Sequence, residues 1–151
     1  MKQRISYFQM CQREGVLLRK GMNFRLGKTY SVILMNVQPS APYRDRIEEN
    51  GRVIIYEGHD NPRPPVGKSP KEVDQELRNR DGSLTQNGLF YEAALKYKEG
   101  KTAPELVRVY EKIERNVWVY KGLFKLVDAW TERSGGRRVF KFRLELVQAD
   151  H

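Results

Sequence analysis

Cysteine, histidine and long apolar runs are the scarce features of this 151-residue sequence. With one cysteine, Cys11, the chain cannot form an internal disulfide or a zinc site built from cysteines. Two histidines, His59 and His151, are too few for a histidine-rich metal centre. No apolar run approaches the roughly 18 residues of a membrane span, and the N-terminus is too polar for a signal peptide. We therefore expect a soluble, cytoplasmic protein that holds no metal or other cofactor and contacts no membrane.

Motifs that would indicate catalysis are also scarce. The glycine patterns of P-loops and dinucleotide-binding turns are missing, and nothing pairs a histidine with a serine or cysteine nucleophile. Asp74, Glu76 and Lys96 could form a magnesium-dependent nuclease site, but among 19 acidic residues such a set arises by chance. The sequence therefore predicts no catalytic residue, and a self-contained metal-dependent nuclease stays open as an alternative function.

Positive charge is what the sequence has in excess. It contains 28 Lys and Arg against 19 Asp and Glu, a net charge of +9. Residues 1–30 carry a net +6 and residues 101–151 a net +4, whereas residues 71–100 carry −1. If the two ends meet in space they form one basic face, which would attract nucleic acid. Many basic proteins bind no nucleic acid, so charge alone does not decide between a DNA-binding and a merely solubilising surface.

Apolar periodicity and breaker residues predict an α+β fold in which strands dominate. A capping box at Ser69 and Glu72, with Pro70 between them, favours the start of a helix. The Pro- and Gly-rich residues 58–70 should form a surface loop, and Ser134-Gly135-Gly136 a hairpin turn. Because unpaired sheet edges are a liability, we expect a curled sheet or barrel. The expected strands are 30–36, 52–57, 106–111, 117–131 and 138–147, and the expected helices are 1–14, 70–78 and 86–99.

Three polar and aromatic residues could form a slot for a planar ring. Tyr43 and Asp45 lie in the loop after the first long strand, and Tyr56 ends the next one. Two tyrosines can stack on the two faces of a base while a carboxylate accepts from its exocyclic amine, which is what a cytosine flipped out of a duplex requires. The alternative is that Tyr56 is an ordinary strand aromatic and Tyr43 a partly exposed surface residue.

Seven segments along the chain carry a family resemblance when they are taken in order. They are Gly27-Lys-Thr-Tyr30-Ser-Val-Ile-Leu, Tyr43-Arg-Asp45, Asn50-Gly51-Arg-Val-Ile-Ile-Tyr56-Glu-Gly58, Asp74-Gln75-x-Leu77, Leu84-Thr85-x-Asn87, Val107-Arg108-Val109-Tyr110 and Gly122-Leu-Phe-Lys-Leu-Val-Asp-Ala-Trp130. Together they resemble the SRA (SET- and RING-associated, or YDG) domain. The resemblance spans about residues 20–147 and is closest to the SRA domains of bacterial modification-dependent restriction endonucleases, in which an HNH nuclease domain follows. It implies an N-terminal helical segment at residues 1–20 and an SRA-like domain at 21–151, within a longer parent protein.

This resemblance implies a curved PUA-like β-barrel flanked by helices, which binds double-stranded DNA and flips out 5-methylcytosine or 5-hydroxymethylcytosine. Tyr43 and Tyr56 would stack on the base and Asp45 would read its edge, while Ser40 and Ala41 would line the slot at cytosine position 5. A homodimer would form through the parent protein. A PUA-like RNA-binding module, which shares the barrel, is the other alternative. Two loops would contact DNA, through Asn23, Arg25, Lys28, Arg63, Lys68 and Lys71.

The charge pattern predicts steep salt dependence of DNA binding. Each phosphate neutralised on duplex DNA contributes about −0.9 to the slope of log affinity against log salt concentration. Several contacts from the two basic ends should therefore weaken binding strongly between about 50 and 200 mM salt, as a titration of one duplex would measure. A flat salt dependence would contradict binding through a basic face.

Overall fold

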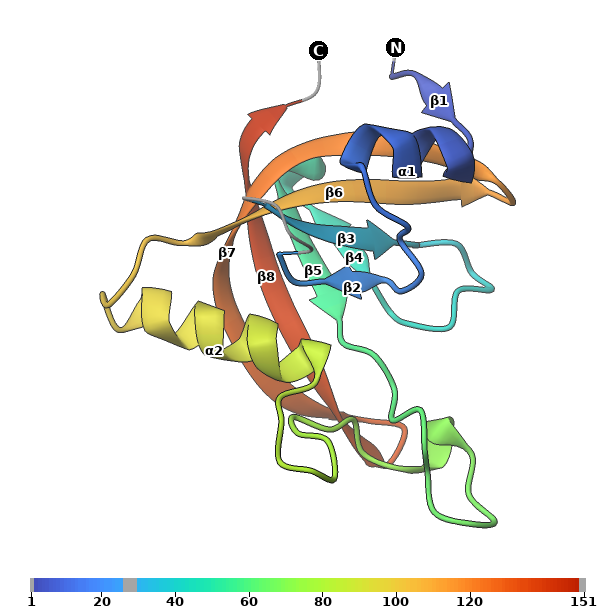
Figure 1. The fold of residues 1–151 in the computed structure, drawn as a ribbon, viewed down its shortest axis with the longest axis vertical. Coiled ribbons are helices and arrows are strands. Elements are labelled where there is room, and N and C mark those ends of the chain that lie inside the picture. The colour runs from blue at the N-terminus through green and yellow to red at the C-terminus, as the bar shows by residue number, and fades with distance from the viewer. Residues whose placement is uncertain (1, 26–29, 150–151) are drawn as a thin grey trace.

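A single mixed sheet organises the chain, as seen in a computed structural model that describes residues 2–25 and 30–149 (Figure 1). The eight described strands follow the order β2-β3-β6-β7-β8-β5-β4, and β1 pairs with β7. All neighbours are antiparallel except β3 and β6. The strands are β1 (Arg4–Ile5), β2 (Met22–Asn23), β3 (Ser31–Met35), β4 (Arg46–Glu48), β5 (Val53–Glu57), β6 (Glu105–Glu114), β7 (Val117–Ser134) and β8 (Arg137–Ala149).

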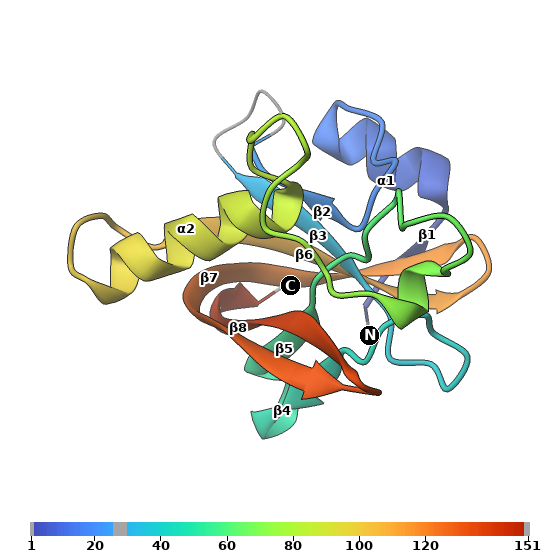
Figure 2. The same cartoon turned by 90° about the horizontal axis from the view of Figure 1, so that it is seen from below.

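The α+β class and the five expected strands are confirmed, but the described sheet does not close into a barrel. Its path ends at β2 on one side and at β4 on the other. β7 and β8 form a long curved ribbon, with β6 along the edge of β7 and β5 along the edge of β8 (Figures 1 and 2). β7 continues through Gly122, which takes φ 127° beside a register shift at Val109 and Tyr110.

Two α-helices lie within the described residues. α1 (Tyr7–Glu14) begins later than expected, because Arg4 and Ile5 pair with β7 and Ser6 then caps the helix through a capping box. α2 (Gln86–Lys98) is capped by Thr85, as the sequence predicts. Neither helix, nor any other in residues 2–25 and 30–149, is long and apolar enough to cross a membrane.

The expected helix at residues 70–78 is wrong. Its capping box at Ser69 and Glu72 forms, but the helix is a single turn of 3-10 helix, η2 (Pro70–Glu72), after which Val73 is extended. The reason is tertiary. The backbone N of Gln75 donates to Arg138 O at 2.9 Å, and its side-chain Oε1 accepts from Phe140 N at 2.8 Å. Hydrogen bonds to β8 therefore hold this segment open. The loop at 38–51 also contains β4 and the 3-10 turn η1 (Glu49–Gly51), which the sequence did not predict.

Two apolar clusters lie on the sheet. Phe90 and Ala94 of α2 pack against Phe124 and Phe142 in the larger cluster, where each fully buried aromatic contributes about 1.5–3 kcal/mol. The smaller cluster lies under α1 and includes Met10. The N-terminal segment thus packs on the sheet.

A polar clamp positions the chain where it leaves β5. Gln75 Nε2 donates to Gly58 O at 2.7 Å, Asn87 Nδ2 donates to His59 O at 3.0 Å, and His59 N donates back to Asn87 Oδ1 at 3.0 Å. A side chain on Gly58 would overlap Asn87 Oδ1. Both amides are fully buried, so residues 58–60 have a fixed course below the cavity described next.

The close packing of α2 predicts that Gly88→Ala destabilises the protein, although alanine normally favours a helix by about 1 kcal/mol. The new Cβ would overlap the backbone oxygen of Leu77 and approach Leu84 Cδ2 to 2.8 Å. Overpacking of this kind typically lowers the free energy of unfolding by about 1–3 kcal/mol, measurable by urea denaturation. Lys96→Ala, at an exposed position of the same helix, should change it by less than about 0.5 kcal/mol. A stabilised Gly88→Ala variant would contradict this packing.

Candidate functional site

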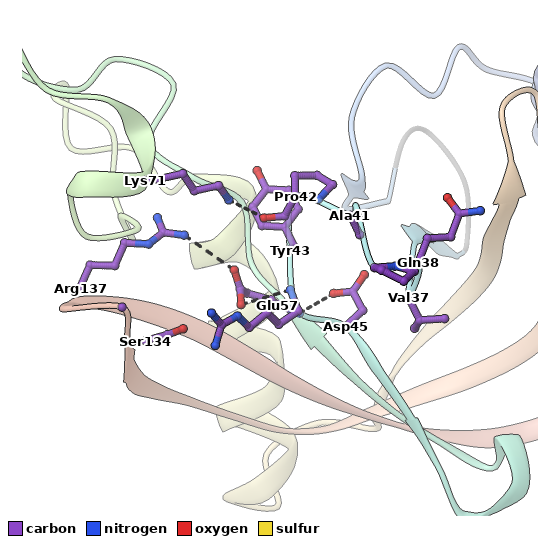
Figure 3. A pocket seen from close by; sticks show the side chains of 13 residues that line it. Val37, Gln38, Ala41, Pro42, Tyr43, Asp45, Glu57, Lys71, Ser134 and Arg137 are labelled. Carbon is purple, nitrogen blue, oxygen red and sulfur yellow. Dashed lines mark hydrogen bonds and ion pairs between the residues drawn. The ribbon is translucent and has the colours of Figure 1, made fainter.

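A surface cavity of about 510 Å³ lies between the loop after β3, the end of β5, η2 and the β7–β8 turn (Figure 3). Lys71 and Arg137 approach it from one side, and Val37 and Gln38 from the other. Its size falls within the roughly 300–1,000 Å³ of small-ligand sites. The cavity is lined by Val37, Gln38, Pro39, Ala41, Pro42, Tyr43, Arg44, Asp45, Glu57, Lys71, Ser134, Gly135 and Arg137.

Strand alternation at the end of β5 decides which side chain faces this cavity. Successive residues of a strand point to opposite faces. Tyr56 points inward, is 4% exposed and donates its hydroxyl to Leu34 O at 3.3 Å, so it belongs to the core. Glu57 consequently faces the cavity. The expected slot between Tyr43 and Tyr56 is not formed in this structure, because Tyr56 does not reach the cavity.

Glu57 is an almost completely buried carboxylate that two cations neutralise. Its side chain is 3% exposed, and Lys141 Nζ, itself 5% exposed, lies 3.1 Å from Oε1. Arg137 Nη2 lies 3.8 Å from Oε2, and Arg44 N donates to Oε1 at 3.4 Å. A buried charge without partners would be strongly destabilising, so these cations are a condition for placing Glu57 here.

Arg137 links this carboxylate to a second one. Its Nη1 donates to Asp60 Oδ1 at 2.7 Å and to the backbone oxygens of Pro70 and Val73 at 3.1 and 3.3 Å. Lys71 pairs with Asp60 Oδ2 at 2.8 Å. Burial alone would raise the pKa of Asp60, but the hydrogen bonds from Lys71, Arg137 and Gln75 lower it, so Asp60 stays ionised. These contacts join β8, η2 and the segment after β5 along one side of the cavity.

Tyr43 supplies the aromatic ring among the cavity's lining residues, and contacts to its hydroxyl and to its ring face hold it in place. Its hydroxyl accepts from Asp60 N at 3.1 Å, and Lys71 Nζ sits 4.3 Å from the ring centroid. Lys71 also donates to Pro42 O at 2.6 Å. Burial raises the pKa of Tyr43, which keeps the phenol neutral. A cation over the ring shows that this face attracts electron-poor groups.

Asp45 lies beside Tyr43 and ties β3 to β5. Its Oδ2 accepts from Asn36 N at 3.1 Å and its Oδ1 from Glu57 N at 2.9 Å. Burial raises the pKa of Asp45 to about 7, although those two hydrogen bonds oppose the shift. Each carboxylate oxygen has a second lone pair, so Asp45 can still accept from a ligand amine.

The other expected site residues differ in their placement. Ala41 lines the cavity, whereas Ser40 is exposed and does not line it. Asn23 is buried, and its side-chain amide donates to Lys20 O and Val32 O. Arg25 is 60% exposed but binds Glu105 at 2.6 Å. Arg63 and Lys68 are exposed on the loop before η2, and Lys28 lies outside the described residues.

Sequence reasoning missed the charged residues Glu57, Arg137 and Lys141. Clean alternation in β8 does place Lys141 on the face opposite Phe140 and Phe142. It does not predict that Lys141 is buried beside Glu57 of β5. The lining residues fall between positions 37 and 137, so the cavity draws on the C-terminal basic stretch and on none of the described residues among the first thirty, which are 2–25 and 30. Among the residues described here, no three His, Cys, Asp or Glu could hold a metal ion together.

Comparison with known proteins gives a consistent result. A family model described as the SAD/SRA domain matches residues 6–149. The histone-lysine N-methyltransferase family member SUVH9 of Arabidopsis thaliana is 24% identical over 134 residues, which are 86% of this chain and 19% of that protein, so the chain spans about a fifth of this relative. The crystal structure of the SUVH5 SRA–hemimethylated CG DNA complex covers 100% of this chain and 92% of its own, with 25% identity and a TM-score of 0.65. SUVH5 SRA bound to fully hydroxymethylated CG DNA gives the same coverage, with 23% identity and a TM-score of 0.66.

The raised pKa of Asp45 predicts a specific pH dependence of stability. From about pH 4 to pH 7 the folded protein binds a proton that the unfolded chain has released, because an unperturbed Asp ionises near pKa 3.9. This contribution to stability is therefore lost as the pH rises toward 7. The unfolding free energy of the wild type minus that of Asp45→Asn should fall between about pH 5 and 7, by up to about 1.4 kcal/mol per unit, and then level off.

Taking this difference removes the effect of His59, whose pKa burial lowers in both proteins. Urea denaturation at each pH measures the two free energies. A difference independent of pH would contradict the burial of Asp45.

Proposed function

The chain belongs to the SAD/SRA domain family, and from this we propose that it binds double-stranded DNA and takes a modified cytosine, flipped out of the duplex, into the cavity beside Tyr43. The observation that carries the proposal is the juxtaposition of an aromatic ring and a hydrogen-bond acceptor, Tyr43 and Asp45, in one surface cavity of adequate size. Solved relatives that are named as complexes with methylated and hydroxymethylated CG DNA support the same conclusion.

The base is recognised by stacking and by its edge. Tyr43 provides the stacking surface, a contact worth about 1–3 kcal/mol per base. Asp45 accepts from the exocyclic amine of cytosine. A base that stacks on the ring face below Lys71 has to displace that ammonium, which then becomes available to a phosphate. Tyr56 has no direct part in this arrangement, since it supports β5 from the core.

Affinity for the duplex comes mainly from phosphate contacts, which carry no sequence information. We assign such contacts to Arg63 and Lys68, which are exposed on the loop that leads to Lys71 at the cavity. Arg25 is a further candidate whose exposed guanidinium is already held by Glu105. We propose that these residues grip the backbone while the cavity holds the base.

The parent protein is a separate proposal that rests on the sequence resemblance alone. The domain would be the recognition module of a cytoplasmic HNH endonuclease that cleaves modified DNA, with no catalytic residue of its own. Dimerisation would then be a property of the parent. A full-length chain that cleaves modified but not unmodified DNA would support this assignment.

Tyr43→Ala and Lys68→Ala should separate base recognition from backbone binding. Losing the stacking surface should weaken binding to modified DNA by about 1–3 kcal/mol, or roughly five- to a hundred-fold, and leave the weak binding of unmodified DNA almost unchanged. Losing a phosphate contact should weaken both by the same factor. Dissociation constants for two duplexes that differ only at cytosine C5, measured at one salt concentration, provide the readout.

Arg78→Ala offers a control, because it removes the same charge as Lys68→Ala at an exposed position that does not line the cavity. Equal affinity of the wild type for the two duplexes would overturn the proposed function. Identical profiles of the Tyr43 and Lys68 variants would overturn the assignment of Tyr43.

A further inference from the structure

A donor and an acceptor lie next to one another on the cavity wall and form an ion pair without a hydrogen bond. Arg137 and Glu57 both line the cavity, with side chains 8% and 3% exposed. Arg137 Nη1 donates to Asp60, Pro70 and Val73. Glu57 Oε1 accepts from Lys141 and from the backbone N of Arg44. The remaining atoms, Arg137 Nη2 and Glu57 Oε2, are 3.8 Å apart, too far for a hydrogen bond.

We infer that this pair selects a modified cytosine whose C5 substituent carries a hydroxyl, in preference to 5-methylcytosine. A hydroxyl is the simplest group that can accept from Nη2 and donate to Oε2 at once. One oxygen can lie about 3 Å from both atoms, because their separation is shorter than two hydrogen bonds laid end to end. The inference rests on the proposed function, since it assumes that the base enters this cavity.

The position of Asp45 directs the C5 substituent toward the pair. Asp45 Oδ1 accepts from the backbone amide of Glu57, so the residue that reads the cytosine amine is fastened directly to the residue that would read the substituent. In cytosine the amine is on C4 and the modification is on C5, so the two groups are neighbours on one edge of the ring. A base with its amine on Asp45 and its N3 turned away from Glu57 brings its C5 group close to Glu57.

A methyl group at this position has no matching chemistry. It would cover Arg137 Nη2 and Glu57 Oε2 without giving either a hydrogen bond, and sites built to bind a hydroxyl strongly reject analogues that lack it. The cavity volume of about 510 Å³ also leaves room for a group larger than hydroxymethyl. A free hydroxymethyl supplies this hydroxyl on the carbon attached to C5, whereas in a glucosylated one that oxygen is a glycosidic ether and only the sugar hydroxyls can donate. Binding has to distinguish these two sources.

The test uses four duplexes identical except at one cytosine, which is unmodified, 5-methyl, 5-hydroxymethyl or glucosylated 5-hydroxymethyl. The protein should bind one or both hydroxyl-bearing duplexes about 10- to 100-fold more tightly than the methylated one, the range for one hydrogen bond to a charged group. Which of the two binds more tightly identifies the source of the hydroxyl. Equal or tighter binding of 5-methylcytosine, with both still above unmodified DNA, overturns this inference and leaves the proposed function standing. No preference for any modified duplex overturns both.

Glu57→Gln tests the residue itself. The amide keeps an oxygen for Lys141 but puts a second donor in front of Arg137, so the ratio of hydroxymethyl to methyl affinity should fall to about one. Glu99→Gln, at the C-terminal cap of α2 and not in the cavity, removes the same charge and should keep the wild-type ratio. A wild-type ratio in Glu57→Gln would overturn the assignment. If this variant unfolds because Lys141 loses its counterion, the series of duplexes on the wild-type protein still decides.

Discussion

The burial of one carboxylate, Glu57, is the constraint on which the rest of this site depends. An ion removed from water is tolerated only with good partners, and the two that approach Glu57, Lys141 and Arg137, both come from β8. Arg137 then needs Asp60, and Asp60 in turn binds Lys71 over the Tyr43 ring. The position of the aromatic ring is thus set by a chain of charges that begins in the sheet. Removing a link would leave an unpaired charge rather than a smaller network.

Backbone geometry makes that chain of charges possible. β5 and β8 pair in a register that sets Glu57 opposite Lys141 and Tyr56 opposite Phe142, so the charged pair and the aromatic pair lie on opposite faces. Beyond β5, the buried amides of Gln75 and Asn87 take over from the sheet and hold residues 58–60. The two segments of the sequence resemblance that contain Gln75 and Asn87 therefore act through the fold, because they fix the course of the chain that carries Asp60. Their effect on binding would be indirect.

The same arrangement relates specificity to stability. Asp45 and Glu57 are adjacent acceptors, but Asp45 has backbone donors and no ion pair with another described residue, whereas Glu57 has two cations. Burial consequently raises the pKa of Asp45 to about 7. A donor such as a cytosine amine would favour the ionised form of Asp45, so ligand binding would relieve part of the unfavourable burial. Sites that bind ligands often retain such unfavourable groups in the free protein.

Local sequence patterns were sufficient to predict five strands, α2 and the hairpin turn after Ser134. These features depend on periodicity, capping and turn chemistry, which operate within a few residues. Tyr43 and Asp45, expected together in one slot, line the same cavity, and their contact with a base stays a prediction. Residues 70–78 were predicted to be helical from a local capping box. The chain is instead extended after η2, because Gln75 hydrogen-bonds to Arg138 of β8, which is 63 residues later in the sequence. Tyr56 was expected in the cavity and lies in the core, since its face depends on which side of β5 the rest of the sheet covers. Likewise, the encounter of Glu57 with Arg137 and Lys141 follows from strand pairing between segments about 80 residues apart, which a single sequence does not encode in any local pattern.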